Sequence, residues 1–265
     1  MEGHDFRKKL AEARRIVVKV GTSSLTGRNS GLDPVKVGRL VSGIMKLRES
    51  GREVILVSSG AIGAGISRLN MKKRPKEMSK LQAAAAVGQG ILMQVYSRYF
   101  NEYGQIVAQM LLTGEDFLDK KRYQNFRNTM QTLLKWGAVP VINENDTVEI
   151  EEIRLGDNDT LSAYVAVGSR ADLLIILSDV DGVYMKRGGK KSVIKTVERV
   201  TKSLESLAEE EYSGTGGIRT KIRAARIATR AGIPVVVANS AEKNVLEKIV
   251  SGAEIGTIFL PVKRP

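Results

Sequence analysis

The chain has 265 residues, a formal net charge of +13, a single histidine and no cysteine. This composition excludes disulfides, thiolate chemistry, Ser-His-Asp catalysis and histidine-rich metal centres. Because the chain carries neither a secretory signal nor an apolar run long enough to span a bilayer, we expect a cytoplasmic protein with no membrane partner.

Short apolar runs alternate with helical patterns along the whole chain. Strands are predicted at 15–20, 53–57, 105–112, 138–142, 172–177 and 234–237, with a further one at 257–260. These runs consist mainly of leucine and β-branched residues without polar alternation, which is typical of strands that helices cover on both faces of a parallel sheet. The expected fold is therefore a three-layer α/β/α sandwich with a mainly parallel central sheet, formed by residues 1–265 as one domain.

The segments between these runs give further predictions. A helix begins at Asp33-Pro34, an N-cap followed by proline, and ends near Gly51. A long helix is predicted over 78–103, where Ala83 to Ala86 permit close packing. We also expect a hairpin at 147–155 and a flexible basic turn at 185–192.

The excess of positive charge is dispersed along the chain. Short basic groups such as Arg7–Lys9, Lys72–Arg74 and Lys120–Arg122 lie far apart, and aromatic residues make up only 5% of the sequence. No aromatic residue interleaves with a basic group, as a platform for stacking nucleic-acid bases requires. We interpret these groups mainly as solvated surface charges; attraction of anionic ligands is the alternative, and nucleic-acid binding is disfavoured.

Ligands of such sheets bind at the carboxyl ends of the strands, and polar residues follow several of the predicted strands. Lys19 interrupts the first apolar run just before Gly21, and a charge in that position needs a partner. We favour a phosphate ligand over a lysine that merely extends to solvent. The segment Ser58 to Gly65 is a second candidate anion site, although its glycines also suit close packing of the helix that follows.

A third loop, Gly214 to Lys221, leads into a helix rich in alanine, arginine and isoleucine. Glycines let backbone N–H groups surround an anion, the helix N-terminus adds positive potential, and Lys221 supplies a full charge. The spacing differs from that of a P-loop, so we expect another class of phosphate-binding protein.

Acid and amide residues form two further clusters, Asn143 to Asp146 and Gly156 to Asp159. They would bind an ammonium group or a metal ion, or orient the lysines; helix capping is the alternative for Asp157 and Asp159. Ser178-Asp179 form either a turn beside a nucleotide or a simple turn.

Two lysines, two anion-binding loops and two acid–amide clusters at one sheet edge suit phosphoryl transfer, which needs alignment and neutralisation of charge. A carboxylate acceptor is already ionised at neutral pH and needs no general base, which agrees with the scarcity of histidine. The residues therefore indicate a kinase that acts on a small carboxylate.

The chain resembles the glutamate 5-kinase family of the amino acid kinase superfamily over nearly its whole length. The motifs that carry the resemblance are Lys19-Val-Gly-Thr-Ser, Ser58-Ser-Gly-Ala-Ile, Gln82-Ala-Ala-Ala-Ala-Val-Gly-Gln89, Val141-Ile-Asn-Glu-Asn-Asp146, Gly156-Asp-Asn-Asp159 and Gly214-Thr-Gly-Gly-Ile-Arg-Thr-Lys221. It implies transfer of the ATP γ-phosphoryl group to the side-chain carboxylate of L-glutamate. Acceptors such as another small carboxylate or a carbamate are the alternative, and an RNA-binding regulatory module is a remote one.

The resemblance also implies roles for individual residues. Lys19 and Lys221 would neutralise the transferring phosphoryl group, and Asp159 would hold both lysines. Glutamate would be bound by Ser59, Gly60, Asp146, Asp157 and Asn158. ATP would be bound by Lys19, Gly21, Ser178, Asp179, Thr215, Gly216, Gly217, Ile218, Arg219, Thr220 and Lys221. At Ile218 and Arg219 relatives often carry methionine and a small residue.

Further expectations follow from the same resemblance. Mg²⁺ would be carried by the nucleotide phosphates, with no protein ligand to the metal. Proline is expected as a feedback inhibitor, and a dimer or tetramer of identical chains is expected. The sequence resembles the catalytic domain alone, without the C-terminal PUA domain of many relatives.

Overall fold

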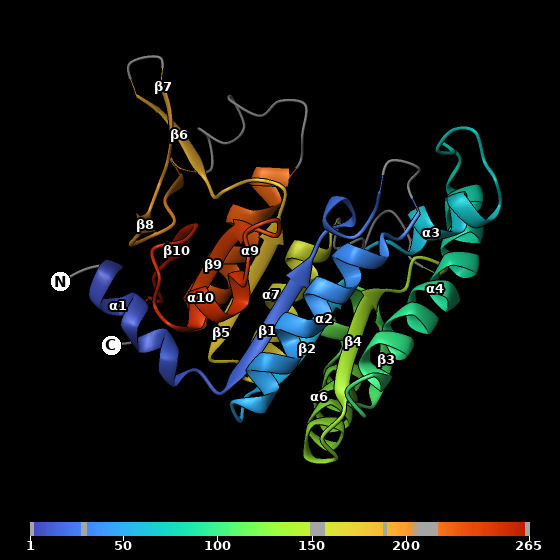
Figure 1. Ribbon diagram of the computed structural model, residues 1–265, viewed down its shortest axis with the longest axis horizontal. Coiled ribbons are helices and arrows are strands. Elements are labelled where there is room, and N and C mark those ends of the chain that lie inside the picture. Colours follow the sequence, from blue (N-terminus) through green and yellow to red (C-terminus); the bar gives the residue numbers. More distant parts are fainter. Residues whose placement is uncertain are drawn as a thin grey trace.

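The computed structural model describes residues 3–27, 31–148, 157–187, 190–202, 204 and 217–262, and its centre is one eight-stranded sheet (Figure 1). The strand order is β3-β4-β2-β1-β5-β9-β10-β8. The strands are β1 (Arg15–Val20), β2 (Glu53–Ser58), β3 (Val107–Leu112), β4 (Val139–Glu144), β5 (Leu173–Ser178), β8 (Thr196–Val197), β9 (Val235–Asn239) and β10 (Thr257–Phe259). All neighbouring strands are parallel except β9 and β10, so the predicted mainly parallel sheet is confirmed.

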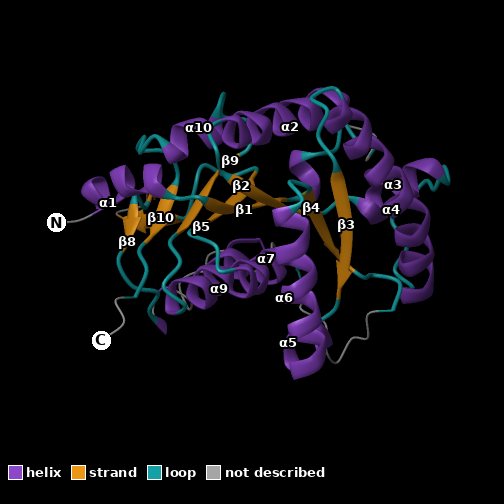
Figure 2. Cartoon of the chain, turned by 90° about the horizontal axis from the view of Figure 1, so that it is seen from below, coloured by secondary structure: helices purple, strands orange, loops and turns teal. Residues whose placement is uncertain are grey.

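Helices cover both faces of this sheet, which confirms the three-layer arrangement (Figure 2). One face packs against α1 (Gly3–Lys9), α2 (Pro34–Glu49), α4 (Met78–Asn101) and α10 (Val245–Val250), and the other against α6 (Lys120–Lys135), α7 (Asn158–Ser169) and α9 (Gly217–Arg230). The shorter helices are α3 (Ala61–Arg68), α5 (Glu115–Leu118) and two 3-10 turns, η1 (Leu10–Glu12) and η2 (Thr22–Ser24). None of the described helices is long and apolar enough to cross a membrane.

Capping explains the start of α2, and close packing explains the small residues of α4. The Asp33 carboxylate accepts hydrogen bonds from the backbone of Val35 at 2.9 Å and of Lys36 at 3.3 Å, so it caps α2 as the sequence indicated. Along α4, Ala84 and Ala85 are buried. A Cβ placed on Gly88 would lie 1.8 Å from the carbonyl oxygen of Ala61, so the backbones of α3 and α4 are in direct contact.

The central strand β1 pairs with β2 on one side and β5 on the other, and its side chains alternate between the two cores. Ile16, Val18 and Val20 pack in the core beneath α2 and α10, whereas Val17 packs in the core beneath α7 and α9. Because alternate residues of a strand share a face, Lys19 points to the same side as Val17. The sequence pattern of β1 thus directs a lysine toward α7 and α9.

Two predicted segments differ from the structure or lie outside it, and one further strand was not predicted. Residues 185–192 were expected as a flexible turn, but they belong largely to an antiparallel pair, β6 (Tyr184–Arg187) and β7 (Lys190–Val193), in which Met185 lies opposite Ser192. Backbone pairing between the two strands overrides the basic, glycine-containing composition. The short strand β8 was not predicted. Of the hairpin expected at 147–155, only Thr147 and Val148 are described, and both lie in a turn.

Candidate active site

Three charged side chains from different elements meet at the carboxyl end of β1. The Lys19 ammonium lies 2.5 Å from Oδ1 of Asp159, in the first turn of α7. The Lys221 ammonium, in the first turns of α9, lies 3.2 Å from Oδ2 of the same carboxylate. The Thr220 hydroxyl donates to that Oδ2 at 2.7 Å. Residues 202 positions apart in the sequence (221 minus 19) therefore share one carboxylate.

This Lys19–Asp159–Lys221 cluster is almost completely buried. The exposed fractions are 7% for Lys19, 2% for Asp159 and 6% for Lys221. Burial alone would raise the pKa of Asp159, but the two ammonium groups outweigh that effect and hold the pKa of this carboxyl below its ordinary value. Two positive charges around one negative charge leave the cluster with a surplus of one positive charge. An anion that enters this site would compensate it.

Two glycines border the cluster. A Cβ on Gly21 would lie 3.5 Å from the Lys19 ammonium, and a Cβ on Gly217 would lie 3.7 Å from the Lys221 ammonium. The space next to both cations is thus free of side-chain atoms from these two positions. A larger side chain at either position would lie against the adjacent ammonium group.

The remaining residues expected to bind nucleotide lie at the ends of β5 and α9. Ser178 is buried, and its hydroxyl donates at 3.1 Å to Asp179, which is exposed. Ile218 packs in the core beneath α9, so a nucleotide could reach only its backbone, whereas Arg219 is exposed. Thr215 and Gly216 lie outside the described residues.

A second cluster consists of amide side chains and a serine. The Asn158 amide nitrogen donates to the Ser59 hydroxyl at 2.7 Å and to Oδ1 of Asn143 at 2.9 Å. The Asn143 amide nitrogen in turn donates to Oε1 of Gln89, on α4, at 2.9 Å. This Ser59–Asn158–Asn143–Gln89 network joins the loop after β2, the start of α7, the end of β4 and the middle of α4.

Two buried atoms of this network have no hydrogen-bond partner within the described chain. They are the amide nitrogen of Gln89, a donor, and the amide oxygen of Asn158, an acceptor. Leaving such an atom unsatisfied costs about 1–3 kcal/mol, so buried polar groups without a partner need an explanation. A ligand that accepts from one and donates to the other would satisfy both.

Backbone geometry and a buried tyrosine shape the loop that carries Ser59. Gly60 has φ +112°, a conformation that favours glycine, and it directly precedes α3. The Tyr96 hydroxyl lies 2.7 Å from the Ser58 hydroxyl, which also donates to the carbonyl of Ser59 at 3.0 Å. Tyr96 is fully buried, and this burial raises its pKa well above the ordinary range.

The two other predicted acids occupy the same edge of the sheet. Asp146 is half-buried in the turn directly after β4. Asp157 accepts from the backbone of Thr160 at 2.8 Å and caps α7, so the capping alternative is confirmed for this residue, whereas Asp159 is committed to the lysines. Burial is the main cause that raises the pKa of Asp157, and the negative charge of the neighbouring Asp159 raises it further.

Sequence reasoning placed Asn143 in one of the acid–amide clusters but gave it no role of its own, and it assigned no role to Gln89, although both stand in motifs that carried the family resemblance. Each is an ordinary amide in the sequence, and its partner lies on another element, 54 residues away for Gln89 and Asn143. The only available signals were the position of Asn143 just after an apolar run and that of Gln89 one turn beyond an alanine-rich segment.

Comparison with known proteins gives a consistent result. The model of the amino acid kinase family matches residues 14–239. A glutamate 5-kinase of Caldanaerobacter subterraneus is 53% identical over 95% of this chain and 69% of the relative, and one of Clostridium acetobutylicum is 49% identical over 96% of this chain and 97% of the relative. A Giardia carbamate kinase structure, 18% identical, superposes with a TM-score of 0.66 over 94% of this chain and 99% of that one, which supports the fold alone.

Proposed function

Because the chain belongs to the amino acid kinase family, and within it to the glutamate 5-kinases, we propose a mechanism in which the Lys19–Asp159–Lys221 cluster stabilises the phosphoryl group in transit. The reaction is the ATP-dependent phosphorylation of the side-chain carboxylate of L-glutamate, which yields L-glutamyl 5-phosphate for proline biosynthesis. The observation that carries the mechanism is the convergence of two buried ammonium groups on one carboxylate.

In this mechanism Asp159 fixes the two lysines, and their surplus positive charge offsets the negative charge of the moving phosphoryl group. The glutamate side-chain oxygen attacks the γ-phosphorus, and the bond from phosphorus to the bridging oxygen of ADP breaks. The attacking carboxylate is ionised at neutral pH, so no proton has to be removed. Lys19 and Lys221 are therefore the catalytic residues of the proposal, and Asp159 positions them.

The second cluster supports a proposal for how glutamate is held. The unpaired amide nitrogen of Gln89 would donate to the α-carboxylate, and the unpaired amide oxygen of Asn158 would accept from the α-ammonium. Asp146 and Asp157 would add negative charge near that ammonium, while Ser59 and Gly60 would border the substrate. An α-amino-free acceptor would lack the donor that Asn158 needs, and an acetylated one would offer a single amide N–H without the positive charge that Asp146 and Asp157 would attract.

Mg²⁺ is expected with the nucleotide. The described residues contain no group of three or more acidic or histidine side chains arranged to hold a metal, and Asp159 is engaged by two lysines. This donor set does not fit an ion held by the protein alone. We therefore propose that the nucleotide phosphates carry the ion, as Mg²⁺ commonly binds.

ATP is proposed to extend from the two lysines toward Ser178 and Asp179 at the end of β5. We also propose a cytoplasmic location, where ATP and glutamate are available, a dimer or tetramer, and inhibition by proline. The edge strand β3 and the neighbouring exposed side chains of Ile106 (68%) and Trp136 (76%) support assembly. Light scattering and a proline titration test the last two proposals.

A hydroxylamine assay tests the reaction itself. With ATP, Mg²⁺ and glutamate, the acyl phosphate should be trapped as a hydroxamate, whereas aspartate, N-acetylglutamate or carbamate should give far less product or ADP. Absence of glutamate-dependent hydroxamate from folded protein would overturn the assignment. Higher turnover with another acceptor would instead assign that acceptor as the substrate, while the chain would remain an amino acid kinase.

A further inference from the structure

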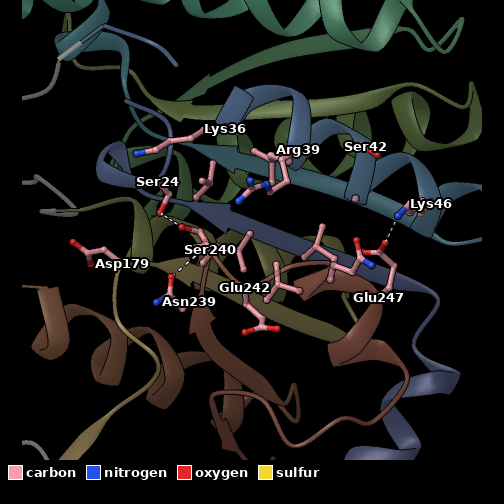
Figure 3. Close-up of a pocket in the computed structure, with 18 of the residues that line it drawn as sticks. Ser24, Lys36, Arg39, Ser42, Lys46, Asp179, Asn239, Ser240, Glu242 and Glu247 are labelled. Atoms are coloured by element: carbon pink, nitrogen blue, oxygen red, sulfur yellow. Dashed lines mark hydrogen bonds and ion pairs between the residues drawn. The ribbon is translucent and has the colours of Figure 1, made fainter. Parts of the chain in front are cut away.

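A cavity lies beneath α2 and α10, on the face of the sheet opposite the helices that carry Asp159 and Lys221 (Figure 3). Its volume is about 330 Å³, within the range of small-molecule sites. One wall is α2 and the other is the segment from the end of β9 into α10; Ser24 and Asp179 lie at one end, and Lys46 and Glu247 at the other.

The charges that line this α2–α10 cavity are mostly engaged. The Lys46 ammonium pairs with Glu247 at 2.7 Å, and Glu242 pairs with Lys248 at 2.5 Å. The Lys36 ammonium donates to two backbone carbonyls, those of Ser23 at 3.0 Å and Thr26 at 2.6 Å. Each of these charged groups is thus already held by at least one contact within the chain.

Arg39 differs from its neighbours on α2. Within the part of the chain that the structure describes, its guanidinium has no hydrogen bond or ion pair, and Figure 3 shows it directed into the space between α2 and the β9–α10 segment. A guanidinium presents several donors in a planar fork that matches a carboxylate or a phosphate. The cavity thus has one available cation, suited to an anion.

The base of the cavity is apolar. Val20, Leu177 and Leu246 line it and are 1%, 2% and 2% exposed. At one end α2 and α10 come close together, because a Cβ on Gly43 would lie 3.3 Å from a methyl group of Leu246. An apolar base below a single free cation selects a small organic anion over a bare inorganic ion.

We propose that the α2–α10 cavity is an effector site, which binds a small organic anion with an apolar body through Arg39. The anionic group is a carboxylate or a phosphate. The effect of the bound anion on catalysis rests on the proposed function, whereas the binding of the anion to the cavity does not.

The strand ends connect the cavity to the candidate active site. Val20 lines the cavity and directly follows Lys19, and Leu177 lines it and directly precedes Ser178. The Ser240 hydroxyl lies 2.8 Å from that of Ser24, and the Ser240 backbone donates to Ser178 at 2.7 Å. An occupant that shifts these contacts would change the positions of residues next to the catalytic lysine and to the expected nucleotide site.

Calorimetry with model anions tests the binding. Phenyl phosphate and phenylacetate share a ring and differ in the anionic group, and benzyl alcohol is the neutral control. Titrations are made with saturating Mg²⁺ and a non-hydrolysable ATP analogue, which occupies the phosphate site. We expect one saturable site for at least one of the two anions, at least tenfold weaker binding in Arg39→Gln, and no binding of the alcohol.

The matched control is Arg98→Gln, because Arg98 is exposed on α4 and the substitution removes the same charge away from the cavity. It should bind the anion as the unmodified chain does. Equal binding by Arg39→Gln, or loss of binding when the ATP analogue is present, would overturn the site. A bound anion that changes neither kcat nor the KM for glutamate would overturn the effector role, and the hydroxamate assay without the anion reports the proposed function separately.

Discussion

At the scale of single residues, the active-site proposal depends on where charges are buried. Of the lysines and arginines whose burial the structure describes, only Arg7, Lys19 and Lys221 are buried. Two of these three share the Asp159 carboxylate. Because a buried charge without a partner is costly, the geometry proposed to bind an anion also makes each member of the cluster sensitive to substitution.

Replacing Lys221 with alanine should remove about 3 kcal/mol of transition-state stabilisation, typical of a preorganised charge partner. This corresponds to a roughly 150-fold loss of kcat/KM, measured by ADP release with glutamate. Lys80→Ala is the control, because its ammonium lies on the surface in a pair with Glu77. That change should stay within about twofold. Similar rates for the two variants would contradict the catalytic role of Lys221.

Asp159→Asn should show a pH-dependent loss of stability. The native pKa of Asp159 is lowered, so its carboxylate stabilises the folded chain above the unfolded pKa of about 3.9. That contribution disappears as the pH falls below about 4 and through the lower native pKa. Urea unfolding from pH 7 to pH 3 should therefore show a gap between the two proteins that narrows on acidification. A constant gap would contradict the lysine-stabilised carboxylate.

Replacing Gln89 with methionine tests how glutamate is held. The donor to the α-carboxylate is lost, so the KM for glutamate should rise about tenfold, as expected for one hydrogen bond to a charged group. The KM for ATP and kcat should change little. Gln94→Met, at an exposed position of the same helix, should leave all three constants unchanged. An unchanged KM in Gln89→Met would remove this residue from the substrate site.

At the scale of elements, the junction of α3 and α4 supports the loop that carries Ser59. Gly65 and Gly88 meet the backbone of the opposite helix, and a Cβ on either would lie 1.8 Å from a carbonyl oxygen. The sequence left open whether glycines near Gly65 bind an anion or permit packing. For Gly65 the structure favours packing, since the backbone of Ala84 occupies the space that a side chain at this position would need.

Gly88→Ala should separate these two helices and destabilise the chain by about 1–3 kcal/mol, the usual cost of overpacking. Gly90→Ala is a close control on the same helix, because a Cβ there meets nothing within 4 Å. This second change should stabilise the chain by up to about 1 kcal/mol. Thermal unfolding measures both, and a lower stability for Gly90→Ala than for Gly88→Ala would contradict the assigned contact.

How well an element was predicted from the sequence follows from how local its cause is. The core strands β1, β2 and β5 were located to within a residue because each is a continuous apolar run with both faces buried. The strands β6 and β7 were missed because they are strands only through pairing with each other, and β8 was missed because its partner, β10, is distant in the sequence. The residues of the site show the same dependence on local causes. The two lysines could be recognised from their positions at the ends of a strand and of a glycine-rich loop, whereas a role for Gln89 is evident only from its hydrogen bond with Asn143, which is distant in the sequence.

At the scale of the whole molecule, Arg7 joins the beginning of the chain to its end. Its guanidinium is 1% exposed and donates to the carbonyls of Lys195, Ala253, Ile255 and Gly256, at 2.7 to 3.3 Å. It therefore fixes α1 against the segments that lead into β8 and β10. Burial lowers the pKa of this guanidinium, which nevertheless remains charged.

Arg7→Met should leave these carbonyls without a donor and lower the free energy of unfolding by at least about 2 kcal/mol. For a chain of this size the midpoint of thermal unfolding should fall by about 4 °C or more. Arg14→Met, at an exposed position nearby, should have little effect. The kcat of Arg7→Met, measured well below its midpoint, should remain close to that of the unmodified chain. A stable Arg7→Met protein would contradict the tie between the two ends.

The 202-residue interval between the two lysines has a consequence for synthesis of the protein. A ribosome has to add 202 residues after Lys19 before the second ammonium group exists, and every fragment that stops short of α9 lacks it. Under the proposed mechanism, such premature termination products cannot consume ATP to form an unstable acyl phosphate. In this mechanism the chain can catalyse the reaction only after α9 has been synthesised.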